Sequence, residues 1–196
     1  MDCIRLKDMD DPAFGECWQL YSGAFPVYEQ RRKEEQRGAM MQPDYHFDAI
    51  YQVGRFVGIM LYWKQKEFIY LEHFAIAPGL RGGGFGTKAL SMLLDEGTQV
   101  ILEIDPVKDE ISEKRLRFYQ SLGFCRNEFK HIHPPYRHQF TGHALEVLSS
   151  GGELDTAKYN DFAFYLNNRV MEYSEQISDR QTYDAFHISL IPFSHV

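Results

Sequence analysis

The chain has 196 residues, a formal net charge of −7 and a hydrophobic fraction of 44%. Its length and apolar content suit one ordinary globular core and exclude a disordered or collagen-like polymer. The net negative charge argues against nucleic-acid binding, because displacing phosphate counterions requires a basic surface. The N-terminus carries no apolar signal sequence, and no window approaches a membrane-spanning run. We therefore expect a cytoplasmic protein without a nucleic-acid or membrane partner, and its three isolated cysteines are expected to be free thiols.

The first half of the chain reads as helices followed by strands. Two acidic residues before Pro12 favour a helix start, and apolar residues then recur at helical spacing. Short connections between the later apolar runs predict antiparallel hairpins. The expected elements are a strand at 4–6, helices at 12–22 and 28–41, and strands at 47–52, 56–63 and 68–77.

In the second half, a strand-loop-helix-strand unit predicts a parallel, right-handed crossover. Ser149-Ser150-Gly151-Gly152 is the best linker candidate. The expected elements are helices at 88–95, 111–122 and 157–173, and strands at 100–104, 124–132, 144–148 and 186–191.

The segment Arg81-Gly82-Gly83-Gly84-Phe85-Gly86-Thr87 carries the strongest chemical signal. Its four glycines let the backbone turn sharply and expose successive N–H groups. The helix that follows adds unpaired N–H donors and the positive end of its dipole. Together these features predict an anion cradle suited to a pyrophosphate.

Two familiar phosphate motifs compete for this loop. The Walker A pattern fails, because Gly86 is followed by Thr87-Lys88 in the wrong order. The dinucleotide pattern GxGxx[G/A] is satisfied from Gly84 to Ala89, with Glu103 at about the expected distance downstream. Two features argue against an NAD(P)-linked oxidoreductase. Extra residues separate the preceding strand from the first matched glycine, Gly84, and the strands upstream are predicted to form antiparallel hairpins rather than parallel strands alternating with helices.

A third pattern, [Q/R]-x-x-G-x-[G/A], is matched by residues 81–86. Here the sequence resembles the GNAT acyltransferase superfamily. Three further segments support the resemblance, which covers about residues 4–148: Ala24-Phe25-Pro26, Phe74-Ala75-Ile76-Ala77-Pro78 and Phe118-Tyr119-Gln120-Ser121-Leu122-Gly123-Phe124.

The resemblance implies an α/β (α+β) fold, in which a mixed, mostly antiparallel sheet is flanked by helices. We expect the GNAT-like domain to span residues 1–150. Residues 151–196 would form a helix-and-strand extension that packs on the same domain or on a partner. Oligomeric state stays open, with a homodimer among the options.

The implied activity is acetyl-CoA-dependent N-acetyl transfer, in which a substrate amine attacks the thioester directly. A backbone N–H at Ile76 or a neighbour would stabilise the oxyanion. Many family members have an Asn that contacts the cofactor at the position of Ser112. The serine here implies a weaker contact with the cofactor at this point. The positions implied to contact the cofactor are Phe74, Ala75, Ile76, Arg81, Gly82, Gly83, Gly84, Phe85, Gly86, Thr87, Ser112 and Tyr119.

Two side chains are implied to be catalytic. Some family members have a general base on the strand that corresponds to residues 68–77. It lies nine or eleven residues before the [Q/R] position, here Arg81, which implies Glu72 or Tyr70. Desolvation would raise the pKa of Glu72 and suit it to accept a proton, with Glu103 as the fallback. Tyr119 occupies the place of the acid that protonates the departing thiolate. Strand alternation is expected to put on one face Tyr70, Glu72, Phe74 and Ile76, with His73 opposite.

The sequence does not specify the acceptor amine, and an amine on a small molecule or on a peptide is equally compatible with it. The wall of its pocket is expected to include Phe25, Glu29, Tyr70 and Tyr136. We expect no metal, because His131 and His133 have no carboxylate or cysteine at ligand spacing nearby in sequence. A non-catalytic acyl-CoA-binding module is the alternative function, and the NAD(P)-linked oxidoreductase is the weaker one.

Overall fold

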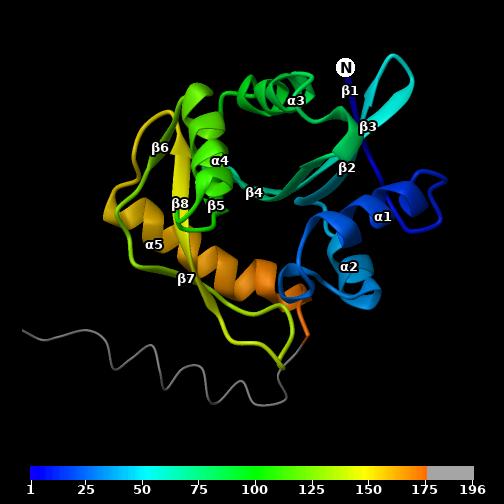
Figure 1. Cartoon of the computed structure of the whole chain (residues 1–196). Coiled ribbons are helices and arrows are strands. Elements are labelled where there is room, and N and C mark those ends of the chain that lie inside the picture. Colours follow the sequence, from blue (N-terminus) through cyan, green and yellow to red (C-terminus); the bar gives the residue numbers. More distant parts are fainter. Residues whose placement is uncertain (176–196) are drawn as a thin grey trace, which may run out of the picture.

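The computed structural model describes residues 1–175, which form one mixed sheet with helices on both faces (Figure 1). The strands are β1 (Asp2–Arg5), β2 (Tyr45–Gln52), β3 (Arg55–Lys64), β4 (Phe68–Ile76), β5 (Gln99–Ile104), β6 (Phe124–Arg126), β7 (His131–His133) and β8 (His143–Ser150). The helices are α1 (Phe14–Ala24), α2 (Lys33–Met40), α3 (Phe85–Leu94), α4 (Glu110–Ser121) and α5 (Thr156–Tyr165). The predicted strand at 186–191 lies outside the described residues.

The strand order is β1-β2-β3-β4-β5-β8-β6, and β7 pairs with the first part of β8. Neighbouring strands are antiparallel except β4 and β5, which pair in parallel through the crossover helix α3. The predicted mixed, mostly antiparallel sheet is confirmed. The parallel pairing runs only from Phe68 with Gln99 to Leu71 with Leu102, although β4 continues to Ile76. Beyond Leu71 the two central strands have separated.

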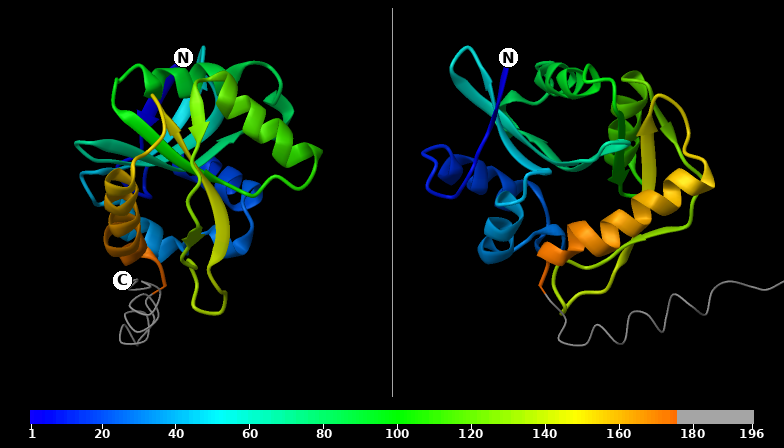
Figure 2. Two further views of the ribbon diagram at one scale, coloured as in Figure 1. Left: turned by 90° about the vertical axis from the view of Figure 1, so that its left-hand side faces the viewer. Right: turned by 180° about the vertical axis from the view of Figure 1, so that it is seen from behind.

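Each face of the sheet carries its own apolar core. Helices α1, α2 and α5 cover one face, and α3 and α4 cover the other (Figures 1 and 2). The amphipathic spacing of α3 explains its position, since Ala89, Leu90 and Leu93 share one helix face and are all buried. The first face is the more aromatic, with Trp63 and Tyr21 fully buried.

The second predicted helix is divided in the structure. A short 3-10 turn, Val27–Glu29, precedes an extended stretch, and α2 begins only at Lys33. Arg31, which falls within the helix predicted at 28–41, lies in this stretch and is buried. The extended stretch lets the Arg31 backbone N–H donate to the Tyr21 hydroxyl, 2.9 Å away.

The segment after β8 is part of the core. Ser149 and Ser150, expected in a linker, are buried in β8 and pair with β5 and β6, so the linker prediction is wrong there. The chain turns only at Gly151 and Gly152, whose positive φ angles of 69° and 119° favour glycine. Helix α5 and the π turn after it, Leu166–Val170, then bury apolar side chains against the α1 face.

No helix among residues 1–175 is long and apolar enough to cross a lipid bilayer.

We predict that Phe162→Ala lowers the free energy of unfolding by about 3–5 kcal/mol, because this side chain is completely buried against Phe68 and Tyr70. Phe164→Ala is the matched control on the same helix, since Phe164 is 70% exposed. Its effect should stay within about 0.5 kcal/mol. Equilibrium urea unfolding measures both values, and equal losses would contradict the packing of α5 described above.

Candidate functional site

A cavity of about 940 Å³ opens where β4 and β5 separate. Its walls come from the α1 end, β4, the loop before α3, α4 and the β7–β8 region. The predicted acceptor-side residues all line it: Phe25, Glu29, Tyr70 and Tyr136. Most of the predicted cofactor positions line it as well: Phe74, Ala75, Ile76, Arg81, Gly82, Gly84, Gly86, Thr87 and Tyr119. The structure thus brings the two predicted groups into one space.

The glycine-rich loop leads directly into the N-terminus of α3. Gly82 and Gly84 adopt positive φ angles of 81° and 75°, which explains the glycine at each position. The first helical hydrogen bond runs from the Lys88 N–H to the Gly84 carbonyl. The N–H groups of the first turn, residues 85–87, therefore have no partner within the helix. This geometry supplies the donors of an anion site at the edge of the cavity.

A β-bulge in β4 changes the predicted register. His73 pairs with Leu61 and Leu71 with Tyr62, so Glu72 is the extra residue opposite β3. Tyr70 therefore faces the α1 core, whereas Phe74 and Ile76 pack against α3 on the other face. The expectation that these side chains share one face is wrong. His73 was expected opposite Glu72, but its ring instead contacts Tyr21 and Phe25 on the α1 face.

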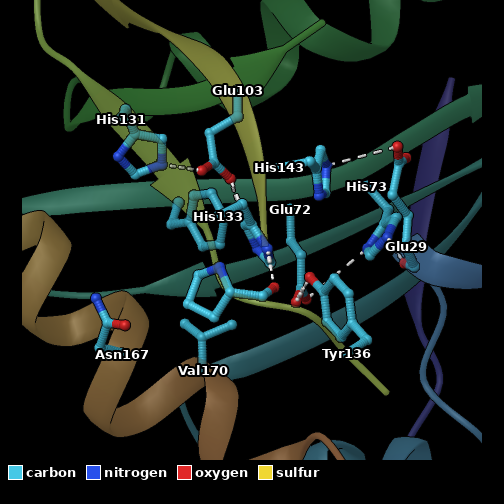
Figure 3. Close-up of polar contacts among 12 residues, drawn as sticks. Glu29, Glu72, His73, Glu103, His131, His133, Tyr136, His143, Asn167 and Val170 are labelled. Atoms are coloured by element: carbon cyan, nitrogen blue, oxygen red, sulfur yellow. Dashed lines mark hydrogen bonds and ion pairs between the residues drawn. The ribbon is translucent and has the colours of Figure 1, made fainter. Parts of the chain in front are cut away.

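The Glu72 carboxylate is completely buried, and both of its oxygens have partners. Figure 3 shows it beside Tyr136. Its Oε1 lies 2.6 Å from Arg31 Nη2 and accepts a hydrogen bond from the Tyr136 hydroxyl at 2.6 Å. Its Oε2 accepts from Trp63 Nε1 at 3.1 Å. Burial alone would raise the pKa of Glu72, but the charge of Arg31 holds it below its usual value. The predicted upward shift is therefore wrong, because sequence alone did not reveal the arginine.

Arg31 ties this carboxylate to the C-terminal segment. Its Nε donates to the Tyr173 carbonyl at 2.8 Å and its Nη2 to the Val170 carbonyl at 3.1 Å. Both carbonyls lie at the end of the α5 segment, where helical carbonyls lack partners. The ion pair thus joins the α1–α2 connection, β4 and the C-terminal extension.

Tyr119 on α4 lines the cavity, and burial raises its pKa to about 12. Its ring packs against Phe118 and Phe124. Ser112, on the same helix, lies outside the cavity lining. Its hydroxyl instead forms a capping box with Asp109, accepting from the Asp109 N–H at 3.0 Å.

Of the other predicted cofactor residues, Gly83 and Phe85 are also absent from the cavity wall formed by residues 1–175. The Phe85 side chain turns into the α3 core, where Ile76 also packs.

The fold also assembles a histidine–carboxylate group that sequence reasoning missed. Glu103 receives hydrogen bonds from His131 and from the Tyr70 hydroxyl, and His133 Nε2 lies 3.8 Å from its Oε2 (Figure 3). The sequence offered no carboxylate near these histidines, but β8 lies between β5 and β7 and brings them together. Although burial opposes it, His133 and His131 lower the pKa of Glu103 to about 2. No group of three or more potential ligands in residues 1–175 has the arrangement of a metal site.

The family model described as the acetyltransferase (GNAT) family matches residues 12–124. The chain belongs to the GNAT acetyltransferase family. A curated relative, the Bacillus subtilis (strain 168) protein named "Putative acetyltransferase YjbC", is 30% identical over 176 residues, covering 87% of this chain and 80% of its own. This GNAT protein is accordingly an N-acetyltransferase.

Solved structures agree with the GNAT assignment. A GNAT-family chain from Bacteroides thetaiotaomicron superposes with a TM-score of 0.81 at 28% identity, covering 87% of this chain and 98% of that one. An aminoglycoside 6'-N-acetyltransferase crystallised with coenzyme A has a TM-score of 0.55 at 16% identity, covering 76% and 96%. The second likeness concerns the fold alone.

We predict that Arg31→Met destabilises this GNAT protein by about 3–5 kcal/mol, because it leaves the Glu72 carboxylate charged and buried without its partner. The double variant Arg31→Met/Glu72→Leu should recover much of that loss, since neither charge remains. The control is Arg32→Met, whose side chain is 44% exposed and whose effect should be within about 1 kcal/mol. Equal losses in the single and double variants, measured by chemical unfolding, would contradict a charge-based effect.

Proposed function

We propose that this protein transfers the acetyl group of acetyl-CoA directly to a substrate amine, without an acyl-enzyme. The observation that carries the proposal is the cavity itself, in which the separated edge of β4, the loop before α3 and Tyr119 face one space. The pyrophosphate would lie on the N–H groups of the loop and the first turn of α3. A structurally similar aminoglycoside acetyltransferase holds coenzyme A, which supports the same co-substrate here.

The free edge of β4 offers amides to the thioester arm. Ala77 N–H donates to the Val57 carbonyl at 3.0 Å, on the β3 side of the strand. Because amide direction alternates along a strand, the Ile76 and Phe74 N–H groups point to the opposite edge, which β5 has left. The pantetheine chain would pair with this edge as an added strand. One of the two amides would stabilise the oxyanion formed at the thioester carbon.

Tyr119 is the proposed acid. Tyr119 lines the cavity from α4, and Phe25 lines it from the end of α1. With its pKa raised to about 12, Tyr119 is protonated at neutral pH and can donate to the departing thiolate. Ser112, held in its capping box, has no part in this proposal.

We predict that Gly84→Asp abolishes acetyl-CoA binding measured by calorimetry. The new carboxylate would repel the pyrophosphate at the start of α3, and its side chain would be strained by the positive φ of 75°. Gly97→Asp is a matched control, because Gly97 has a φ of 77°, has open space at its Cβ position and lies beyond the far end of α3. It should bind acetyl-CoA as the wild type does. Unchanged binding by Gly84→Asp would remove the loop from the proposed site.

We predict that Tyr119→Phe lowers kcat roughly 10²-fold or more, because the thiolate loses its proton donor, while the affinity for acetyl-CoA changes little. Release of free thiol gives kcat, and calorimetry gives the affinity. Tyr51→Phe serves as the control, since Tyr51 lies outside the cavity lining. Wild-type turnover by Tyr119→Phe would exclude the acid role.

A further inference from the structure

The buried engagement of Glu72 leaves neither of its carboxylate oxygens free to accept a proton from the amine. Both of its oxygens already accept hydrogen bonds, and one is paired with Arg31. Glu103 is similarly held by His131 and Tyr70. An acceptor amine would have to displace these partners to transfer a proton. A carboxylate that lines the same cavity and has no hydrogen-bond partner on its oxygens can accept the proton of the amine more readily.

Glu29 fits this description. It ends the short turn Val27–Glu29 on the acceptor-side wall, and its side chain is 23% exposed. His73 Nε2 donates to the Glu29 backbone carbonyl at 2.8 Å. This bond fixes the backbone of Glu29 against β4 at His73. Glu29 therefore lines the cavity from an anchored backbone.

The surroundings of Glu29 tune it for proton transfer. Burial raises its pKa to about 7, the nearby Asp105 and Glu103 act in the same direction, and Arg115 opposes them. A carboxylate with this pKa is about half ionised at neutral pH, where a general base is most efficient. Tyr28, His143 and His73 are further titratable groups beside Glu29, and His73 contacts its backbone carbonyl.

His143, the first residue of β8, faces the Glu29 carboxylate (Figure 3). Its Nε2 lies 3.8 Å from Glu29 Oε1 and has no hydrogen-bond partner among the described residues. Burial lowers the pKa of His143, and His133 adds to this effect, so the ring is neutral at neutral pH. A buried polar atom without a partner is unusual, and a proton donor on a bound substrate would satisfy it.

We infer that Glu29 is the general base that takes the proton from the acceptor amine, with His143 positioning its carboxylate. This inference rests on the proposed acetyl transfer. An aliphatic amine enters as its ammonium ion and gives one proton to Glu29. The freed nitrogen then attacks the thioester carbon, the C–S bond breaks with its electron pair on sulfur, and Tyr119 protonates the sulfur. The second proton on nitrogen leaves as the amide forms and restores Tyr119 through solvent.

The test measures thiol release by the full-length protein with acetyl-CoA and four probe amines: spermidine, kanamycin, tyramine and a peptide with a free N-terminal alanine. With the best probe, kcat of the wild type should rise with pH through about 7, since only ionised Glu29 accepts a proton. Glu29→Gln should lose this limb and reduce kcat about 10²–10⁴-fold. Its affinity for acetyl-CoA should be unchanged, which shows that the site is still folded.

Matched variants separate a base from a structural residue. Glu34→Gln removes the same charge from an exposed position on α2 and should keep both rate and pH limb. Glu29→Asp, which keeps a carboxylate, should recover part of the rate. His143→Phe should move the midpoint of the limb without changing acetyl-CoA affinity, as expected of a positioning residue.

The outcomes distinguish this inference from the function on which it rests. If the wild type binds acetyl-CoA but acetylates none of the four amines, the proposed transfer fails and the base assignment with it. If the wild type acetylates an amine and Glu29→Gln keeps the same rate and pH limb, only the base assignment is overturned. Loss of the limb in Glu29→Gln with retained cofactor affinity supports both.

Discussion

The parallel pairing of β4 with β5 ends at Leu71 and Leu102, and the functional geometry of this protein depends on that separation. Past this point β4 keeps its bonds to β3, so its other edge presents unpaired amides to a cavity rather than to a neighbouring strand. Helix α3 makes the crossover between the two strands, and the glycine-rich loop before it follows the free part of β4 along the chain. The loop and the free strand edge therefore line the same cavity.

The bulge at Glu72 lies at this separation and turns its carboxylate toward Arg31. Because the guanidinium also reaches the Val170 and Tyr173 carbonyls, three distant segments meet at one buried charge pair. A buried pair of this kind contributes little net stability over an apolar pair, but it strongly penalises any arrangement that separates its members. Its effect is to hold the acceptor-side wall and the C-terminal extension in a single arrangement.

Three carboxylates around the cavity have very different proton affinities. Arg31 holds Glu72 ionised, and His133 and His131 hold Glu103 ionised. Glu29 is buried without a cationic partner in contact, and its pKa is about 7. Environments that separate the pKa values of neighbouring acids are a common basis for dividing acid–base roles. Here the division assigns two carboxylates to structure and leaves one available for proton transfer.

The sequence by itself determined the features that depend on local chain chemistry. The glycines of residues 81–87 predicted a sharp turn, and Gly82 and Gly84 adopt positive φ angles there. The helical spacing after the loop predicted a helix packed on the sheet, and α3 makes the predicted crossover. The resemblance of residues 118–124 to the GNAT family, rather than local chain chemistry, implied a place for Tyr119 near the cofactor, and Tyr119 lines the cavity.

Only the tertiary structure decided which side chains meet. The bulge shifts the faces of β4 by one residue, and no periodicity in the strand announces it, because the bulge arises from pairing with β3. The neighbours that determine proton affinity come from remote segments: Arg31 for Glu72, and Asp105 and Arg115 for Glu29. The pKa of a carboxylate depends on burial and on charges a few ångströms away, and chain folding, not sequence spacing, sets those distances.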